Sequence, residues 1–416
     1  MKQLLFIFIC ITLVSCNQFK GLRPLSVDVS EDIIIPEHYI IAKTTNDIVI
    51  DGNSDEASWN STKFTANFID IKDAKTPKFD TKVKMLWDNM YLYVFAELKE
   101  PHIWANLKQR DTIIYFNNDF EVFLDPAGNG IGYGEIEVNA LNTVWDLYLN
   151  KPYRIGGKAN FEWNLNDLKS AVQVQGTLNN PNDIDSHWTV EMAIPLKPLI
   201  GLKNKPKTIP KEGEQWRINF SRVQWDHDII DGTYHRKKDD DKYLREYNWV
   251  WSKQGVINMH EPEKWGFLQF TEQSSSDGVE FIEDKDLEIK QTAFALYRKT
   301  RYGDLKNLLE HISGFTQDIT VTYSEGKVVN AKFFKTNFGF TAIDFPILGT
   351  IGYYGIQFFF AGSGFLITYL LLAEFQQYKS ISLKYFYTRR ILRIWPAYYL
   401  LIFLALIVVL KLAFFR

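Results

Sequence analysis

The residue types that most often carry catalysis or bind metals do not form a recognisable motif in this chain. The seven histidines are scattered, and no two of them form a His-x-x-x-His zinc pair. The cysteines are Cys10 and Cys16, at an apolar N-terminus, so neither a disulfide framework nor a four-thiolate zinc site is indicated. Met85, Met192 and Met259 could ligate a haem, but no haem-attachment motif accompanies them. The sequence therefore gives little support to a zinc or haem protein.

Carboxylates are abundant, and two kinds of chemistry are open to them. Glycoside hydrolysis needs two carboxyl groups at a fixed separation, one of them with a raised pKa. The 50 acidic residues allow such a pair, but no motif selects one, so hydrolysis stays an alternative. Calcium needs several convergent oxygens, which an Asp/Asn-rich turn such as Asp125–Asn129 could supply. A structural Ca²⁺ site is therefore kept as a second alternative.

The composition of the 416 residues limits the class of protein. With 46% hydrophobic and 15% aromatic residues, the chain can bury a core and is not intrinsically disordered. A net charge of −3, from 47 basic and 50 acidic residues, gives no electrostatic reason to expect nucleic acid as a partner. Of the 12 tryptophans, 11 lie between Trp59 and Trp265. The length allows two or three domains, and the tryptophans gather in the long middle part.

The middle part reads as a series of short strands. Residues Thr81–Trp87 and Tyr91–Glu97 each alternate between apolar and polar side chains, and Asp88-Asn89 separates them as a turn, which predicts a hairpin. Further strands are expected at 119–124, 134–140, 171–176, 188–194, 215–223 and 265–270. Helical patterns do not separate them, so the sequence predicts an antiparallel β-sandwich.

Five separated blocks in this part resemble carbohydrate-binding module family 9 and its secreted relatives. They are Ile50–Trp59, Leu86–Tyr93, Asn118–Pro126, Trp188–Pro195 and Trp265–Phe267. The resemblance covers about residues 45–270. Residues 134–154 also resemble the larger stand-alone members of bacterial outer-membrane systems. The resemblance implies a β-sandwich that binds poly- or oligosaccharides without cleaving them, often with structural Ca²⁺.

The resemblance also points to candidate sugar-binding residues. A sugar ring needs an aromatic plate for its apolar face and fixed polar groups for its hydroxyls. The first of the family's two clamping tryptophans falls near Tyr115, and a hydroxyl-binding carboxylate falls at Glu121. The second clamp falls at Met259-His260, and a family arginine falls at Glu137, so this sequence departs from the pattern at both places. Three more candidates, for compensating roles, are Asn139, Trp145 and Trp251. The framework tryptophans Trp59, Trp87, Trp188 and Trp265 are expected in the core.

The N-terminus resembles a bacterial lipoprotein signal. A short basic start and an apolar run lead to Leu13-Val14-Ser15-Cys16, which is similar to a lipobox. We expect residues 1–16 to be a signal peptide, Cys16 to be the lipidated residue, and 17–44 to be a tether.

After the sandwich, residues 271–286 are polar, Ser-rich and acidic, which is typical of a linker. A helix is expected over Leu287–Ser313, followed by strands at Asp318–Tyr323 and Val328–Phe334 with a turn at Ser324-Glu-Gly326. We assign 287–340 to a small α/β appendage of the sugar-binding part.

The C-terminal part, 345–416, contains two apolar stretches, 348–372 and 394–410, each long enough to cross a lipid bilayer as a helix. The loop between them, about 374–393, carries five basic residues and Glu374. By the positive-inside rule it is cytoplasmic, and the preceding sandwich is then outside. The sequence thus predicts an exported, membrane-anchored protein of the cell envelope.

Within this part, residues 350–410 resemble a fragment of membrane acyltransferase family 3, on Tyr354–Ile367 and Tyr385–Tyr398. That family acylates cell-surface sugars and uses a His and an Arg on an earlier membrane helix. The stretch 338–349 has neither, so no general base for a sugar hydroxyl is evident and we expect no acyl transfer. Three arginines could contact lipid headgroups or an acyl-donor phosphate: Arg389, Arg390 and Arg393. O-acylation of surface glycans is kept as an alternative function.

Overall fold

The computed structural model describes residues 25–204, 206–301, 303, 305, 316–324, 326–335 and 341–344. The chain divides into two units, Met1–Ile343 and Asp344–Arg416, and the elements below belong essentially to the first. The expected signal peptide with Cys16 and the expected membrane segments lie outside the described residues. Within the described ranges, no helix is both long enough and apolar enough to span a bilayer.

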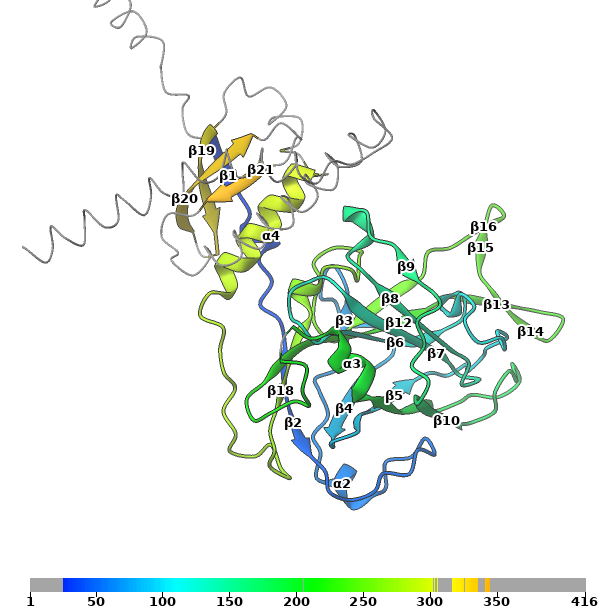
Figure 1. Ribbon diagram of the computed structural model, residues 1–416. Coiled ribbons are helices and arrows are strands. Elements are labelled where there is room, and N and C mark those ends of the chain that lie inside the picture. Colours follow the sequence, from blue (N-terminus) through cyan, green and yellow to red (C-terminus); the bar gives the residue numbers. More distant parts are fainter. Residues whose placement is uncertain are drawn as a thin grey trace, which may run out of the picture. The chain divides into compact units, whose positions relative to one another are not determined.

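Thirteen strands form one large curled sheet (Figure 1). Its main order is β10-β11-β5-β4-β2-β18-β12-β6-β7-β8-β9, and β17 pairs with β12 and β3 beside it. The strands are β2 (His38–Lys43), β3 (Ile69–Asp70), β4 (Thr81–Trp87), β5 (Tyr91–Lys99), β6 (Asp119–Asp125), β7 (Tyr133–Asn139), β8 (Val144–Leu149), β9 (Ala159–Asn160), β10 (Lys169–Gln175), β11 (His187–Pro195), β12 (Gln215–Gln224), β17 (Tyr247–Val250) and β18 (Gly266–Phe270).

Smaller elements decorate this sheet. Two hairpins, β13 (His227–Ile230) with β14 (Thr233–Arg236) and β15 (Lys238–Asp239) with β16 (Lys242–Tyr243), extend from it. The helices of this part are short: α2 (Ala57–Asn60), α3 (Leu196–Leu202), η1 (Ser30–Asp32), η2 (Ile114–Phe116), η3 (Tyr153–Ile155) and η4 (Pro262–Lys264).

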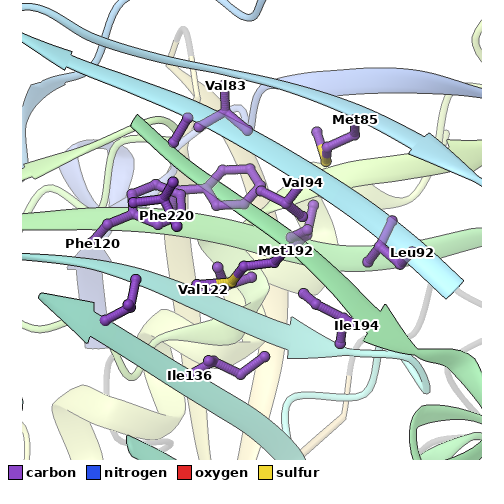
Figure 2. Packing of buried hydrophobic residues seen from close by; sticks show 14 of the residues in the cluster. Val83, Met85, Leu92, Val94, Phe120, Val122, Ile136, Met192, Ile194 and Phe220 are labelled. Carbon is purple, nitrogen blue, oxygen red and sulfur yellow. The ribbon is translucent and has the colours of Figure 1, made fainter. Parts of the chain in front are cut away.

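Strand β2 joins the two halves of the sheet. Its residues His38–Ile41 pair with β18, and Ala42-Lys43 pair with β4, both in parallel. The two halves then fold over a shared core, to which β4, β5 and β11 contribute Val83, Leu92 and Met192, and β6 and β12 contribute Val122 and Phe220 (Figure 2). The predicted mainly β, sandwich-like fold is confirmed, with parallel pairing at β2 where antiparallel strands alone were expected.

The framework tryptophans are core residues, as the sequence predicts. Trp59, Trp87, Trp188 and Trp265 are each at most 1% exposed. The Trp87 indole Nε1 also donates to the Thr271 carbonyl oxygen at 2.9 Å, so its one polar atom is satisfied inside the core.

Strands β6 and β7 are buried on both faces, and the two faces differ in chemistry. Phe120, Val122, Leu124, Ile136 and Val138 belong to the shared core. The alternate positions must point to the opposite face, because successive side chains of a strand alternate. Those positions hold Asp119, Glu121, Phe123 and Asp125 on β6, and Glu135, Glu137 and Asn139 on β7. The sheet therefore presents carboxyl groups on the side away from the core.

A second, four-stranded sheet has the order β1-β19-β20-β21, from Leu25–Asp28, Thr316–Tyr323, Lys327–Lys335 and Thr341–Asp344. The two strands predicted after residue 315 are thus confirmed. The described part of the preceding helix, α4, is Leu287–Arg301, and most of the rest of the expected helix, as far as residue 313, lies outside the described residues. Residues 17–44 are not merely a tether: β1 pairs in parallel with β19, and β2 belongs to the sandwich.

Candidate functional site

A cavity of about 750 Å³ lies over the carboxyl-bearing face of β6, β7 and β8. Strand residues form its floor, and four loop segments supply its walls: 111–115, 153–161, 246–248 and 257–260. A volume of this size matches the range typical of small-molecule pockets.

The floor is a row of side chains in direct register. Glu121 on β6 lies opposite Glu137 on β7, and Glu137 lies opposite Trp145 on β8. One row further along, Phe123 lies opposite Glu135. Three glutamates and one indole thus come from three adjacent strands onto one surface, because the strand alternation places residues i and i+2 on the same face.

Aromatic rings at the edge of the cavity remain open to solvent. Tyr115, Tyr153 and Phe161 are 37%, 44% and 55% exposed. The Phe161 ring stacks on Trp145, with ring centroids 5.6 Å apart and an interplanar angle of 26°. Exposed rings of this kind offer flat apolar surfaces to a ligand.

Three residues that line the cavity carry buried polar atoms without a partner among the described residues. Glu135 Oε2, Trp145 Nε1 and Asn258 Nδ2 are inaccessible to solvent and have no hydrogen-bond partner within the described structure. All three residues line the cavity. A buried polar group without a partner costs free energy, so these atoms favour a ligand or water that would pair with them.

Burial dominates the electrostatics of the floor. It raises the pKa of Glu121 to about 7, with a further contribution from the charge of Glu246. Burial and the charge of Glu121 raise the pKa values of Glu135 and Glu137 well above the ordinary range. The raised pKa values favour the protonated forms, and a protonated carboxyl group can donate as well as accept a hydrogen bond.

His260 forms part of the wall and is held neutral. Its Nδ1 lies 3.0 Å from the Tyr133 hydroxyl, and its ring meets the Tyr153 ring edge to face, with centroids 4.7 Å apart. Burial, with a smaller contribution from the charge of Arg154, lowers the pKa of His260 to about 4. The imidazole is therefore an aromatic, uncharged wall residue at neutral pH.

Six of the eight residues expected from the sequence line this cavity: Tyr115, Glu121, Glu137, Trp145, Met259 and His260. Two do not. Asn139 is fully buried, and its amide is used by the backbone: Nδ2 donates to Leu107 O, and Oδ1 accepts from the N–H groups of Leu141 and Thr143. Trp251 is 3% exposed and packs in the shared core, where its ring lies against Phe220.

The sequence reasoning missed several lining residues. Glu135 shares its face with Glu137, so strand alternation alone could have found it. Tyr153 lies in a stretch that the family resemblance included, but no pattern marked its ring as exposed. Phe161 and Asn258 come from loops, whose position depends on contacts distant in sequence.

The Asp125–Asn129 turn does not offer free oxygens to calcium. The Asp125 carboxylate accepts the backbone N–H groups of Ala127, Gly128 and Gly130 at 3.1, 2.9 and 2.7 Å. Asn129 Oδ1 accepts the N–H of Ile131. Because these oxygens close the turn, the structure does not support the turn as a calcium site.

A family comparison identifies the sandwich. The family described as "Carbohydrate family 9 binding domain-like" matches residues 50–273, more than half of the chain. The chain belongs to this family. The matched range of the family 9 domain contains every residue that lines the cavity, since all of them lie between Ile71 and His260.

Solved structures similar to this family 9 protein include a candidate carbohydrate-binding protein from Bacteroides uniformis. It is 16% identical with a TM-score of 0.40, covering 57% of this chain and 100% of the other. Another is a carbohydrate-binding module of family 9 from Caldicellulosiruptor kristjanssonii in complex with cellotriose. It is 18% identical with a TM-score of 0.36, covering 59% of this chain and 100% of the module.

Two curated relatives match short segments. An uncharacterized protein of Haemophilus influenzae is 58% identical over 43 residues, and the peptidoglycan O-acetyltransferase OatA of Listeria monocytogenes is 41% identical over 56 residues. These matches cover 10% and 14% of this chain. The chain spans only 17% and 9% of the length of these relatives.

Proposed function

We propose that the family 9 sandwich binds a saccharide in the cavity over β6, β7 and β8 and does not cleave it. The observation that carries this proposal is the coincidence, in one cavity, of exposed aromatic rings with buried polar atoms that lack partners. A pyranose presents an apolar C–H face edged by hydroxyls, so rings and unpaired polar atoms complement it.

The pKa pattern of the floor favours binding over hydrolysis. A glycosidase pairs a protonated carboxylic acid with a carboxylate that stays ionised as base or nucleophile. Here burial raises the pKa of Glu121, Glu135 and Glu137 alike, so it favours the protonated form of all three and selects none of them as the ionised partner. Hydrolysis remains the alternative that a turnover assay addresses.

The test is direct binding by the full-length protein, purified in detergent. Glycan arrays should identify a ligand, and calorimetry should then give saturable binding. Tyr153→Ala should weaken it, whereas Tyr243→Ala, an exposed tyrosine on β16 outside the cavity, should not. Release of product from an aryl glycoside of the bound sugar would overturn the non-catalytic assignment.

The cell-envelope location is also part of the proposal. It rests on the leader with its lipobox-like end at Cys16 and on the charge difference around the C-terminal apolar stretches. In a bacterial host, Cys16→Ala should abolish incorporation of labelled fatty acid. A cysteine introduced into the loop 374–393 should be protected from a membrane-impermeant thiol reagent added to intact cells.

The membrane end is proposed as an acyltransferase-like fragment that contacts lipid headgroups or acyl-donor phosphate through Arg389, Arg390 and Arg393. The short match to OatA supports a relation to O-acetyltransferases. Acyl transfer to glycan by membranes that contain the full chain would favour the enzymatic alternative. Sequencing the transcript across residues 335–355 would distinguish a genuine fusion from two joined reading frames.

A further inference from the structure

Three carboxyl groups converge in the floor of the cavity. One oxygen from each of Asp119, Glu121 and Glu137 lies within 4.8 Å of the others. Asp119 and Glu121 are two residues apart on β6, and Glu137 is the direct partner of Glu121 on β7. The three side chains are 0%, 5% and 2% exposed. Glu121 and Glu137 also line the cavity, so the cluster borders the space for a ligand.

Two buried oxygens, one in the cluster and one on a residue of the same face, lack hydrogen-bond partners among the described residues. Asp119 Oδ2 and Glu135 Oε2 are buried and have no hydrogen-bond partner within the described structure. Their residues are 0% and 6% exposed. The other oxygen of Asp119, Oδ1, accepts the Val223 N–H at 3.3 Å, which holds the carboxyl group in place. An orphaned buried carboxylate oxygen is costly, and a cation is the partner that best satisfies it.

The acids of this cluster have no ion-pair partner in the part of the chain that the structure describes. None of the ion pairs found between described residues involves Asp119, Glu121, Glu135 or Glu137. Two other buried acids of the same domain are paired: Glu100 lies 3.0 Å from Arg222, and Glu261 lies 2.9 Å from Lys264. Buried charges are normally paired or coordinate metals, so the unpaired cluster differs from these two acids.

We propose that Asp119, Glu121 and Glu137 form a divalent-cation site in the floor of the cavity, and that the bound cation contacts saccharide hydroxyls. The second part rests on the proposed sugar-binding function. The donor set contains only carboxylate oxygens, which suits hard cations such as Ca²⁺ or Mn²⁺.

One cation could bind the three carboxylates and contact the saccharide hydroxyls at the same time. Calcium takes about six to eight oxygen ligands, and three carboxylates supply only some of them. The remaining positions face the cavity through Glu121 and Glu137, where water or vicinal hydroxyls can complete the shell. Glu135, two residues from Glu137 on the same face of β7, has a buried oxygen without a partner among the described residues and could be a further donor. The site is distinct from the Asp125 turn, whose oxygens are already engaged.

The first experiment measures the cation alone. Full-length protein stripped with EDTA is titrated with CaCl₂ and MnCl₂ by calorimetry and with Tb³⁺ by luminescence sensitised by nearby aromatic residues such as Trp145. We expect one cation per chain and a higher melting temperature in its presence. Glu137→Gln, which removes the charge and keeps the shape, should weaken cation binding at least tenfold. Glu246→Gln, a cavity-lining carboxylate outside the cluster, should change it less than threefold.

The second experiment measures the saccharide identified on the array, with EDTA or with Ca²⁺. At least tenfold weaker sugar binding in EDTA, restored by Ca²⁺, supports the inference. Sugar binding that EDTA leaves unchanged, together with no cation effect on melting or luminescence, overturns it while the proposed function stands. Cation binding that is unchanged in Glu137→Gln also overturns the site. If the cation binds as expected but no saccharide binds under any condition, the sugar contact and the proposed function are overturned. The cation site then still stands.

Discussion

Glu121 and Glu137 are direct cross-strand partners on β6 and β7, and both side chains are buried on the face of the sheet away from the core. Like charges opposite each other destabilise an antiparallel pair, and burial adds to the cost. The protein therefore keeps an unfavourable pair of side chains, which lowers the stability of the fold, at the cavity. Residues that break a folding rule in this way are expected at functional sites.

Glu137→Gln should therefore stabilise the protein when no divalent cation is present. The amide keeps an acceptor for the Tyr115 N–H, which lies 3.1 Å from Glu137 Oε2, but has no charge to bury. We expect the free energy of unfolding in EDTA to rise by about 1–3 kcal/mol, as measured in urea. Glu246→Gln, at a half-buried position, serves as the control and should shift it by less than about 0.5 kcal/mol. A destabilised Glu137→Gln variant would contradict the idea that the buried charge is costly.

Tyr115→Ala should weaken saccharide binding by about 1–3 kcal/mol, because it removes an exposed ring from the cavity wall. The Tyr115 backbone N–H still reaches Glu137 in the variant, so the floor should keep its geometry. Calorimetry with the array-identified sugar measures the effect, and Tyr243→Ala is the matched control. Unchanged affinity would remove Tyr115 from the site.

Trp145→Phe separates two roles of one residue. Phenylalanine can keep the stacking on Phe161, but it removes the indole Nε1, which has no hydrogen-bond partner among the described residues. We expect sugar affinity to fall about three- to tenfold, the loss of one hydrogen bond, with little change in melting temperature. An equal affinity in the variant would show that Nε1 does not contact the ligand.

Local sequence patterns predict much of the sheet because they encode local geometry. The hairpin of β4 and β5 followed from alternation and from Asp88, whose Oδ1 accepts the N–H groups of Met90 and Tyr91 in the turn. The double parallel pairing of β2 was missed, because its partners lie far along the chain and leave no local signal. The same limit applies to Phe161 and Asn258, which only the folded loops bring to the cavity.

Asn139 and Trp251 show where residue type misleads. Both have side chains suited to sugars, but Asn139 satisfies a backbone turn and Trp251 fills the core. Trp251 packs closely on Gly266 of β18: a Cβ there would lie 2.3 Å from Trp251 Cζ3. The sequence around Trp251 contains no sign of that approach.

Gly266→Ala should therefore destabilise the sandwich without involving the cavity. The added methyl group would overlap the Trp251 ring, and overpacking a close-packed core typically costs about 1–3 kcal/mol. Urea unfolding measures the loss. Gly201→Ala, in α3, is the control, because Gly201 also lacks a positive φ and an added Cβ there meets nothing within 4 Å. A Gly266→Ala variant as stable as the parent would contradict the packing described for Trp251.

His260 gives the chain a predictable response to acid. Its pKa is about 4 in the folded protein because of burial, against an ordinary value near 6.5 in the unfolded chain. Between these values the unfolded chain binds one more proton, so the stabilisation by the neutral ring is present above pH 6.5 and is lost as the pH falls toward 4. The loss amounts to at most about 3.5 kcal/mol, at about 1.4 kcal/mol per pKa unit. Other groups in the cavity also titrate, so the measurement is the difference in unfolding free energy between the parent and His260→Gln at pH 4.5, 5.5 and 7.5. That difference should shrink as the pH falls, whereas His235→Gln, at an exposed position on β14, should track the parent throughout. Parallel curves for the parent and His260→Gln would show that the ring is not held neutral against Tyr133 and Tyr153.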